Sequence, residues 1–164
     1  MKTLKNRRRE NKTDYKKRLG LLKSRKPRIV FRKTNRYIIG QYITSKNAQD
    51  KIALGLTSNE LIKYGWPKDF NGSLKSITAS YLTGYLIGKR ITKEKLENPI
   101  LDLGMIRVSH KTKVYAFIKG LIDSGIEINC EEENFPEEER IQGKNLKKDF
   151  SKTFKEIKSK LDKI

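Results

Sequence analysis

The residues with the clearest chemical potential are the cations at the start of the chain. Residues 1–36 hold 16 Lys or Arg and only two acids, a net charge of +14. Clusters such as Arg7–Arg9 and Lys16–Arg18 are spaced to reach successive phosphates, and each neutralised phosphate releases counterions. Arginine offers a planar fork for phosphate, and Tyr15 and Tyr37 can stack on unpaired bases. This basic arm is therefore predicted to bind nucleic acid, and a folded RNA is favoured because no DNA-binding motif is present.

The composition of the whole chain supports a polyanionic partner. Its 164 residues contain 38 Lys or Arg and 19 Asp or Glu, which gives a net charge of +19 and a pI near 10.0. Nucleic acid is the first candidate and an anionic membrane surface the second, although the apolar face of the arm is only three residues wide. The length suits one domain, and 35% apolar residues exclude full disorder. No secretory signal or membrane span is expected, so a cytoplasmic location is predicted.

Catalytic and metal sites are poorly supported by the residues available. One cysteine, Cys130, excludes a disulfide within the chain and Cys-Cys zinc motifs, and Cys130 is expected to be a small, half-buried side chain. The one histidine, His110, precedes a helix beside Lys111 and Lys113 and is interpreted as a neighbour of phosphate or base. A metal-dependent nuclease needs converging carboxylates, but Asp102 is the one such acid inside a predicted strand and has no evident partner. No enzyme activity, cofactor or metal is therefore expected.

The elements that must position the arm begin with a short helix. Thr13 or Asn11 can cap this helix, and Pro27 is expected to stop it. Its apolar positions are Tyr15, Leu19 and Leu22. Three β-rich segments follow and predict an antiparallel meander: Arg28–Thr34, Tyr37–Thr44 and Lys51–Leu56. The residues Thr34, Asn35 and Arg36 form a predicted tight turn between the first two.

The second half of the chain shows helical periodicity. Ser73 is predicted to cap a long helix in which Ser80, Gly84 and Gly88 let the helix approach a sheet closely. A strand over Pro99–Gly104 and a helix over Lys111–Asp123, stopped by Gly125, follow. Residues 126–128 are interpreted as a fifth strand, and Trp66 as packing on the sheet edge. The predicted fold class is α/β, a mixed sheet of about five strands flanked by helices.

The last part of the chain separates into an acidic and a basic segment. Residues 127–139 hold seven glutamates, and residues 140–164 carry a net charge of +6. The acidic run lacks the spacing of a calcium loop, so it is interpreted as a solvated loop or as a cover for basic surface. In the predicted organisation a basic arm (1–26) precedes an α/β core (27–130), an acidic loop (131–143) and a Lys-rich helix (144–164).

Several blocks of sequence together resemble one known family. These blocks are Arg7–Tyr15, Arg18–Ser24, Pro27–Arg36, Tyr64–Trp66, Ala79–Gly84, Ile100–Gly104, Ala116–Gly125 and Phe135–Gly143. They stand in the order of the ribosomal protein L18 family, of the archaeal and eukaryotic type, and span roughly residues 5–145. The resemblance implies a ribonuclease-H-like domain used as a scaffold. It also implies that the chain binds 5S rRNA and anchors it to large-subunit rRNA and neighbouring proteins in the central protuberance of the ribosome.

In this family the basic N-terminus and the first hairpin face 5S rRNA. Carried onto this chain, the resemblance assigns RNA contacts to Arg7, Arg8, Arg9, Lys12, Tyr15, Lys16, Arg18, Lys23, Arg25, Arg28, Arg32, Lys33, Thr34, Asn35 and Arg36. Charge and position add Lys26, His110, Lys111 and Lys113. Two other functions remain open: a non-ribosomal RNA chaperone, and an RNA-processing nuclease on the same type of fold.

Overall fold

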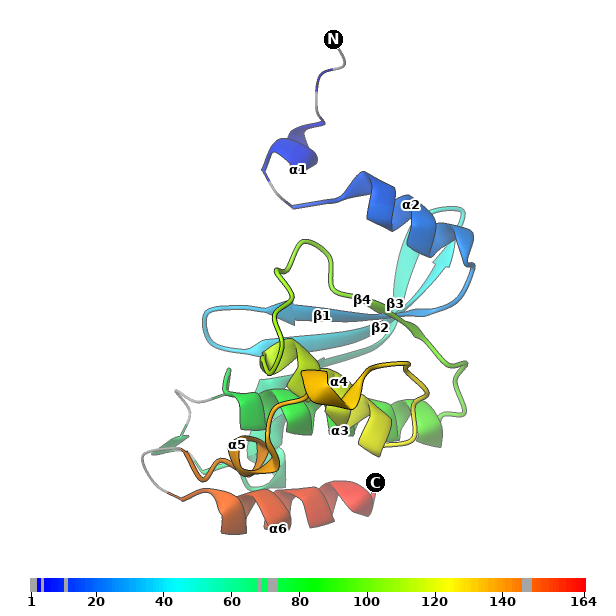
Figure 1. Ribbon diagram of the computed structural model, residues 1–164. Coiled ribbons are helices and arrows are strands. Elements are labelled where there is room, and N and C mark those ends of the chain that lie inside the picture. The colour runs from blue at the N-terminus through cyan, green and yellow to red at the C-terminus, as the bar shows by residue number, and fades with distance from the viewer. Residues whose placement is uncertain (1–2, 4, 11, 68, 71–73, 146–148) are drawn as a thin grey trace.

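Three consecutive strands and one distant strand form the sheet. The computed structural model of the chain describes residues 3, 5–10, 12–67, 69–70, 74–145 and 149–164. The strands are β1 (Arg28–Lys33), β2 (Ile38–Lys46), β3 (Gln49–Thr57) and β4 (Ile100–Asp102), in the spatial order β3-β2-β1-β4. β1 pairs antiparallel with β2 and parallel with β4 (Figure 1). The predicted mixed sheet is confirmed, and the described residues form four strands in place of about five.

Alternation along β1 separates the two faces of the sheet. Ile29 and Phe31 are buried on the side of α3 (Ile77–Lys93) and α4 (Lys113–Asp123), where the ring of Phe31 lies 5.1 Å from that of Phe117. Successive side chains of a strand point to opposite faces. Arg28 and Arg32 therefore face the other side, over which α1 (Asn6–Arg9) and α2 (Tyr15–Lys23) lie (Figure 1).

The glycines of α3 serve helix packing and not the sheet, so that prediction was wrong. A Cβ atom on Gly84 would overlap the carbonyl oxygen of Phe117, and one on Gly120 would overlap that of Tyr81. The Ser80 hydroxyl donates to the Lys113 carbonyl at 2.6 Å. Small residues on both helices thus let α3 and α4 pack so closely that their backbones are in contact.

Two predicted boundaries differ from the structure. Ser76, and not Ser73, caps α3, since its hydroxyl accepts from the Ala79 amide at 3.1 Å. Ser73 lies outside the described residues. Residues 126–128 form no strand, because the Ile126 amide donates to the Leu121 carbonyl and closes the end of α4.

Further short helices complete the helical layer. The 3-10 helix η1 (Ser58–Tyr64) and the α-helices α5 (Glu138–Gln142) and α6 (Ser151–Asp162) contact α3, and the 3-10 helix η3 (Glu132–Asn134) precedes α5. One face of α6 is buried, and its buried residues are Phe154, Ile157 and Leu161, which recur at helical spacing. Trp66 is 2% exposed, and its ring packs 4.7 Å from Phe150 before α6, where the sequence suggested the sheet edge. Within the described residues, no helix is long and apolar enough to cross a membrane.

Candidate nucleic-acid interface

The arm has a defined local structure at the start of α2. Asp14 caps this helix by accepting from the amides of Lys16 and Lys17 at 3.1 and 3.3 Å, so the predicted cap at Thr13 was wrong. The other predicted cap, Asn11, lies outside the described residues. These bonds, led by the one from Lys17, and the charge of Arg8 at 3.3 Å lower the pKa of the Asp14 carboxyl. Asp14 therefore remains ionised and stabilises the first turn of α2.

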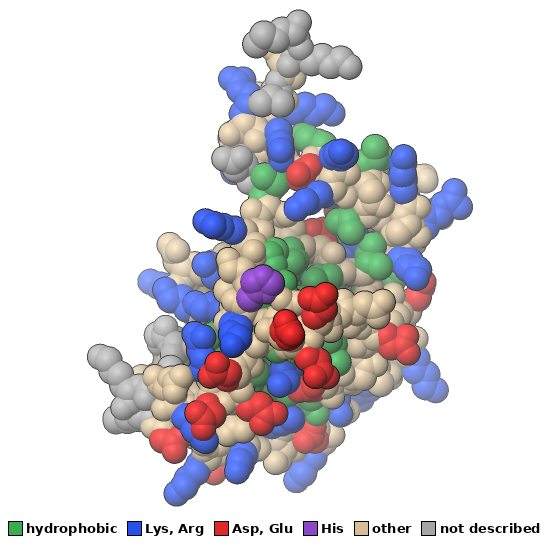
Figure 2. All heavy atoms as spheres, viewed as in Figure 1, with side chains coloured by type: hydrophobic (Ala, Val, Ile, Leu, Met, Phe, Trp, Pro, Cys, Tyr) green, Lys and Arg blue, Asp and Glu red, His purple; other side chains and the backbone are tan. Residues whose placement is uncertain are grey.

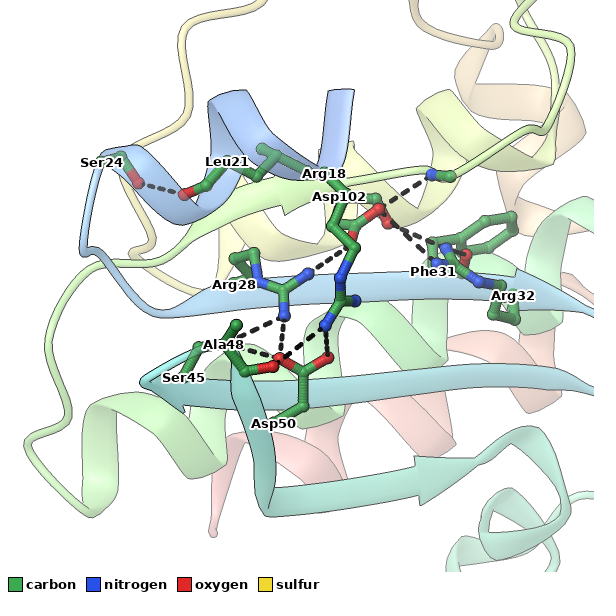
Figure 3. A network of polar contacts seen from close by, with 11 residues as sticks. Arg18, Leu21, Ser24, Arg28, Phe31, Arg32, Ser45, Ala48, Asp50 and Asp102 are labelled. Atoms are coloured by element: carbon green, nitrogen blue, oxygen red, sulfur yellow. Dashed lines mark hydrogen bonds and ion pairs between the residues drawn. The ribbon is translucent and has the colours of Figure 1, made fainter. Parts of the chain in front are cut away.

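An ion pair fixes α2 to the sheet. The guanidinium of Arg18 lies 3.1 Å from Asp50 on β3 and donates to the Ala48 carbonyl in the turn before it (Figure 3). Partial burial acts to raise the pKa of Asp50, but hydrogen bonds from Ser45, Arg28 and Arg18 outweigh it and lower that pKa. No residue of α2 is buried, so the Arg18–Asp50 ion pair is one of the main contacts that hold this helix against the strands.

Arg28, which the sequence assigned to RNA, is an internal residue in the structure of the protein alone. It is 2% exposed and donates to Asp102 at 2.8 Å, to Asp50 at 2.7 Å and to Ser45 at 3.0 Å (Figure 3). Asp102 is held by two arginines, since Arg28 and Arg32 both reach its carboxylate. One guanidinium thus joins carboxylates from β3 and β4.

Arg32 is held from one side and open on the other. Its guanidinium donates to the carbonyls of Phe31 at 2.7 Å and Asp102 at 3.1 Å, and its side chain is 41% exposed. It lines a cleft of 590 Å³ between the arm and the segment after β4. The other cations of this cleft are Arg7, Lys12, Lys17 and Arg18, and its apolar residues include Leu21, Leu101 and Val108.

The predicted turn between β1 and β2 is confirmed. The Thr34 hydroxyl accepts from the amides of Arg36 and Tyr37 at 3.3 and 2.9 Å, and the Thr34 amide donates to the Tyr37 carbonyl. Lys33, Thr34, Asn35 and Arg36 are all exposed. The turn therefore presents two cations to solvent on a fixed backbone.

Most of the predicted cations are free to meet an anion. The following eight are exposed and lie more than 4.0 Å from every described carboxylate oxygen: Arg7, Arg9, Lys16, Lys23, Arg25, Lys26, Lys33 and Arg36. Arg8 and Lys12 instead pair with Asp14 and Glu10. Tyr15 is 36% exposed, but its ring lies beneath the Lys5 ammonium at 4.7 Å.

His110, Lys111 and Lys113 lie in and after the loop that precedes α4. The imidazole of His110 stacks on Tyr115 and its Nδ1 contacts the Asn134 side chain, so one ring edge is already engaged. Lys111 reaches Glu137 at 3.4 Å. Lys113 has a lowered pKa, because burial and then the charges of Lys33 and Lys75 disfavour its charged form. Lys33, at the end of β1, thus lies next to the loop that precedes α4. The same loop carries a further cation, Arg107, which the sequence pattern did not single out.

The acidic run lies apart from the arm. Among the described residues, three of its seven glutamates pair with lysines of this chain: Glu137 with Lys111 at 3.4 Å, Glu138 with Lys119 at 4.0 Å and Glu139 with Lys144 at 3.0 Å. Figure 2 shows acidic side chains gathered on the lower half of this face, with basic side chains among them, and mainly basic side chains over the arm. Within the described part of the chain, no three His, Cys, Asp or Glu side chains group as metal ligands would. Cys130 is half-buried, as predicted.

Comparison with known proteins finds similarity to large-subunit ribosomal proteins over most of the chain. The family described as "Ribosomal large subunit proteins 60S L5, and 50S L18" matches residues 1–99. The large ribosomal subunit protein uL18 of Korarchaeum cryptofilum (strain OPF8) is 48% identical over 140 residues, which cover 85% of this chain and 70% of the relative. The first match spans the arm and the whole sheet except β4, and the second extends over most of the molecule.

Proposed function

The chain belongs to the family of large-subunit ribosomal proteins that includes 50S L18 and 60S L5, and on this premise we propose that its arm and first hairpin bind 5S rRNA. It is a structural component of the large ribosomal subunit. Its proposed task is to anchor 5S rRNA to large-subunit rRNA and to neighbouring proteins of the central protuberance.

The observation that carries this proposal is a basic surface that the fold holds in place while many of its exposed cations stay unpaired with described carboxylates. The Arg18–Asp50 pair positions α2 over the sheet, and the Thr34 hydroxyl shapes the turn. Exposed cations on both elements then lie free of described carboxylates, which is the arrangement that phosphate contacts require. Counterion release on binding supplies affinity that does not depend on base sequence.

The protein is proposed to act as a scaffold without catalysis. Asp50 and Asp102 are the carboxylates that the strands bring closest to the candidate interface, and Arg28 bridges them. Each carboxylate is thus neutralised by a buried side chain of the same protein. This arrangement favours a structural role for both acids over the nuclease alternative.

Deletion of residues 1–26 tests the proposed function. No side chain of α1 or α2 is buried, so the shortened chain should keep the circular dichroism spectrum of its core. Its affinity for 5S rRNA should fall by more than about tenfold, and the dependence of log K on log salt should become shallower by about one for each phosphate that the arm no longer neutralises. An affinity within about threefold of the full chain would contradict the proposal.

The chaperone alternative predicts a different outcome. A ribosomal constituent should co-sediment with the large subunit through a moderate salt wash, whereas a free RNA chaperone should be released.

The variant Arg36→Gln provides a milder test of the hairpin, because Arg36 is exposed and makes no ion pair with the described acids. It should lower the salt slope by about one unit if the turn contacts a phosphate.

A further inference from the structure

A second basic pocket borders the loop between β4 and α4, which also lines the cleft beside the arm. It has a volume of 330 Å³ and forms where the end of β1 meets the start of α4. Five cations line it: Lys33, Arg107, Lys111, Lys113 and Arg140. They come from three separate parts of the chain, β1, residues 107–113 and α5, so the fold and not one local run of charge assembles the cluster.

Most of these cations lack a counter-charge. Lys111 pairs with Glu137, but no described carboxylate lies within 4.0 Å of Lys33, Arg107, Lys113 or Arg140. Glutamates are available nearby, yet those at 138 and 139 pair with lysines outside the pocket. Clustered like charges raise the free energy of the folded protein, and a bound anion would offset that cost.

Part of the wall of the pocket, between the cations, is apolar. Ile77 and Ile106 are half-buried at the pocket, and Phe31 and Val114 complete the lining from the core. A small inorganic anion gains nothing from such a wall, because it has no apolar surface to bury. A nucleotide does, since its ribose or base carries apolar surface next to the charged phosphate.

We propose that this pocket binds one nucleotide of RNA, with its phosphate against Lys33, Arg107 and Lys113 and its ribose or base against Ile106 and Ile77. The proposal rests on the proposed function and adds a second point of attachment, away from the arm. An acidic protein segment is the competing occupant. RNA is favoured because Lys33 makes the pocket continuous with the exposed turn of the β1–β2 hairpin.

The first test compares two double variants that remove the same charge. Arg107→Gln with Lys113→Gln should weaken binding of 5S rRNA or of the large-subunit rRNA fragment next to it, and should lower the salt slope by about one to two units. Lys63→Gln with Lys93→Gln, two exposed lysines without described ion pairs, should leave the slope within error. Equal effects of both pairs, or no effect of the first on either RNA, would overturn the proposal.

The second test locates the bound strand. A hydroxyl-radical probe attached at Arg107→Cys, in a Cys130→Ser background, should cleave an RNA segment different from the one cleaved by a probe at Lys16→Cys on α2. Cleavage from position 16 alone would overturn the pocket proposal and leave the proposed function standing. Full affinity of the chain that lacks residues 1–26 would instead contradict the proposed function itself.

Discussion

Arg28 on β1 and Asp102 on β4 form a buried ion pair between neighbouring parallel strands, with 2.8 Å between Nη1 and Oδ2. The two residues are 74 positions apart in sequence. Asp102 also accepts from the Gly104 amide at 2.9 Å and faces Arg32 at 3.5 Å. The same pair therefore joins β4 to the meander and orients an arginine of the candidate RNA surface.

Arg28→Ala is expected to destabilise the protein by about 3–5 kcal/mol, because the buried charge of Asp102 loses the nearer of its two arginine partners. Asp102→Asn should cost less, since Arg28 keeps Asp50 as a partner. Urea unfolding followed by circular dichroism measures both. A cost below about 1 kcal/mol for Arg28→Ala would show that solvent reaches this network.

The acid stability of the protein should depend on Asp50. Its pKa in the folded state lies below the ordinary value of 3.8, so its contribution to stability is present above that value and is lost as the pH falls through the folded pKa. Asp50→Asn should remove this component and flatten the free energy of unfolding below about pH 4. Unfolding curves of both proteins between about pH 2 and 6 give the comparison.

Arg18→Gln should loosen α2 while leaving the core intact. A partly exposed ion pair contributes about 0–1 kcal/mol, so global stability should change little. In the variant, the amide hydrogens of residues 15–23 should exchange faster with solvent. Hydrogen–deuterium exchange measures this rate. Arg25→Gln is the matched control, since Arg25 is exposed and has no ion pair with the described acids. Equal exchange in both variants would mean that the Arg18–Asp50 contact does not hold the helix.

Two Gly→Ala variants should have opposite effects on stability. Gly84→Ala places a Cβ atom on the Phe117 backbone, so α3 and α4 must separate, at a cost of about 1–3 kcal/mol or more. Gly20→Ala lies in α2 with nothing within 4 Å, and it should stabilise that helix by about 0.5–1 kcal/mol. Thermal unfolding of both variants decides. A neutral Gly84→Ala would contradict close packing of the two helices.

Neutralising Glu131, Glu132 and Glu133 together by Gln should leave specific binding of 5S rRNA intact. All three are exposed, and among the described residues none forms an ion pair. Stability should change by less than about 0.5 kcal/mol. Binding of unrelated RNA should rise, because repulsion of phosphate is removed. A large loss of specific binding would instead assign the acidic run to the RNA site.

The sequence by itself determined the features that depend on neighbouring residues. The meander, the turn after Lys33 and the helix ended by Gly125 follow from alternation, periodicity and turn chemistry within short windows. The basic arm and the likeness to a ribosomal protein family were also readable from residue types in order.

Only the tertiary structure decided which cations are free and which are internal. Arg28 and Arg36 look alike in a basic run, but Arg28 meets a carboxylate 74 positions away and Arg36 meets solvent. The tertiary structure likewise decides that Gly84 packs against α4 and that Lys33 lies near Lys113. A side chain's charge is a property of the residue, whereas its partner depends on long-range packing, and no local pattern encodes that pairing.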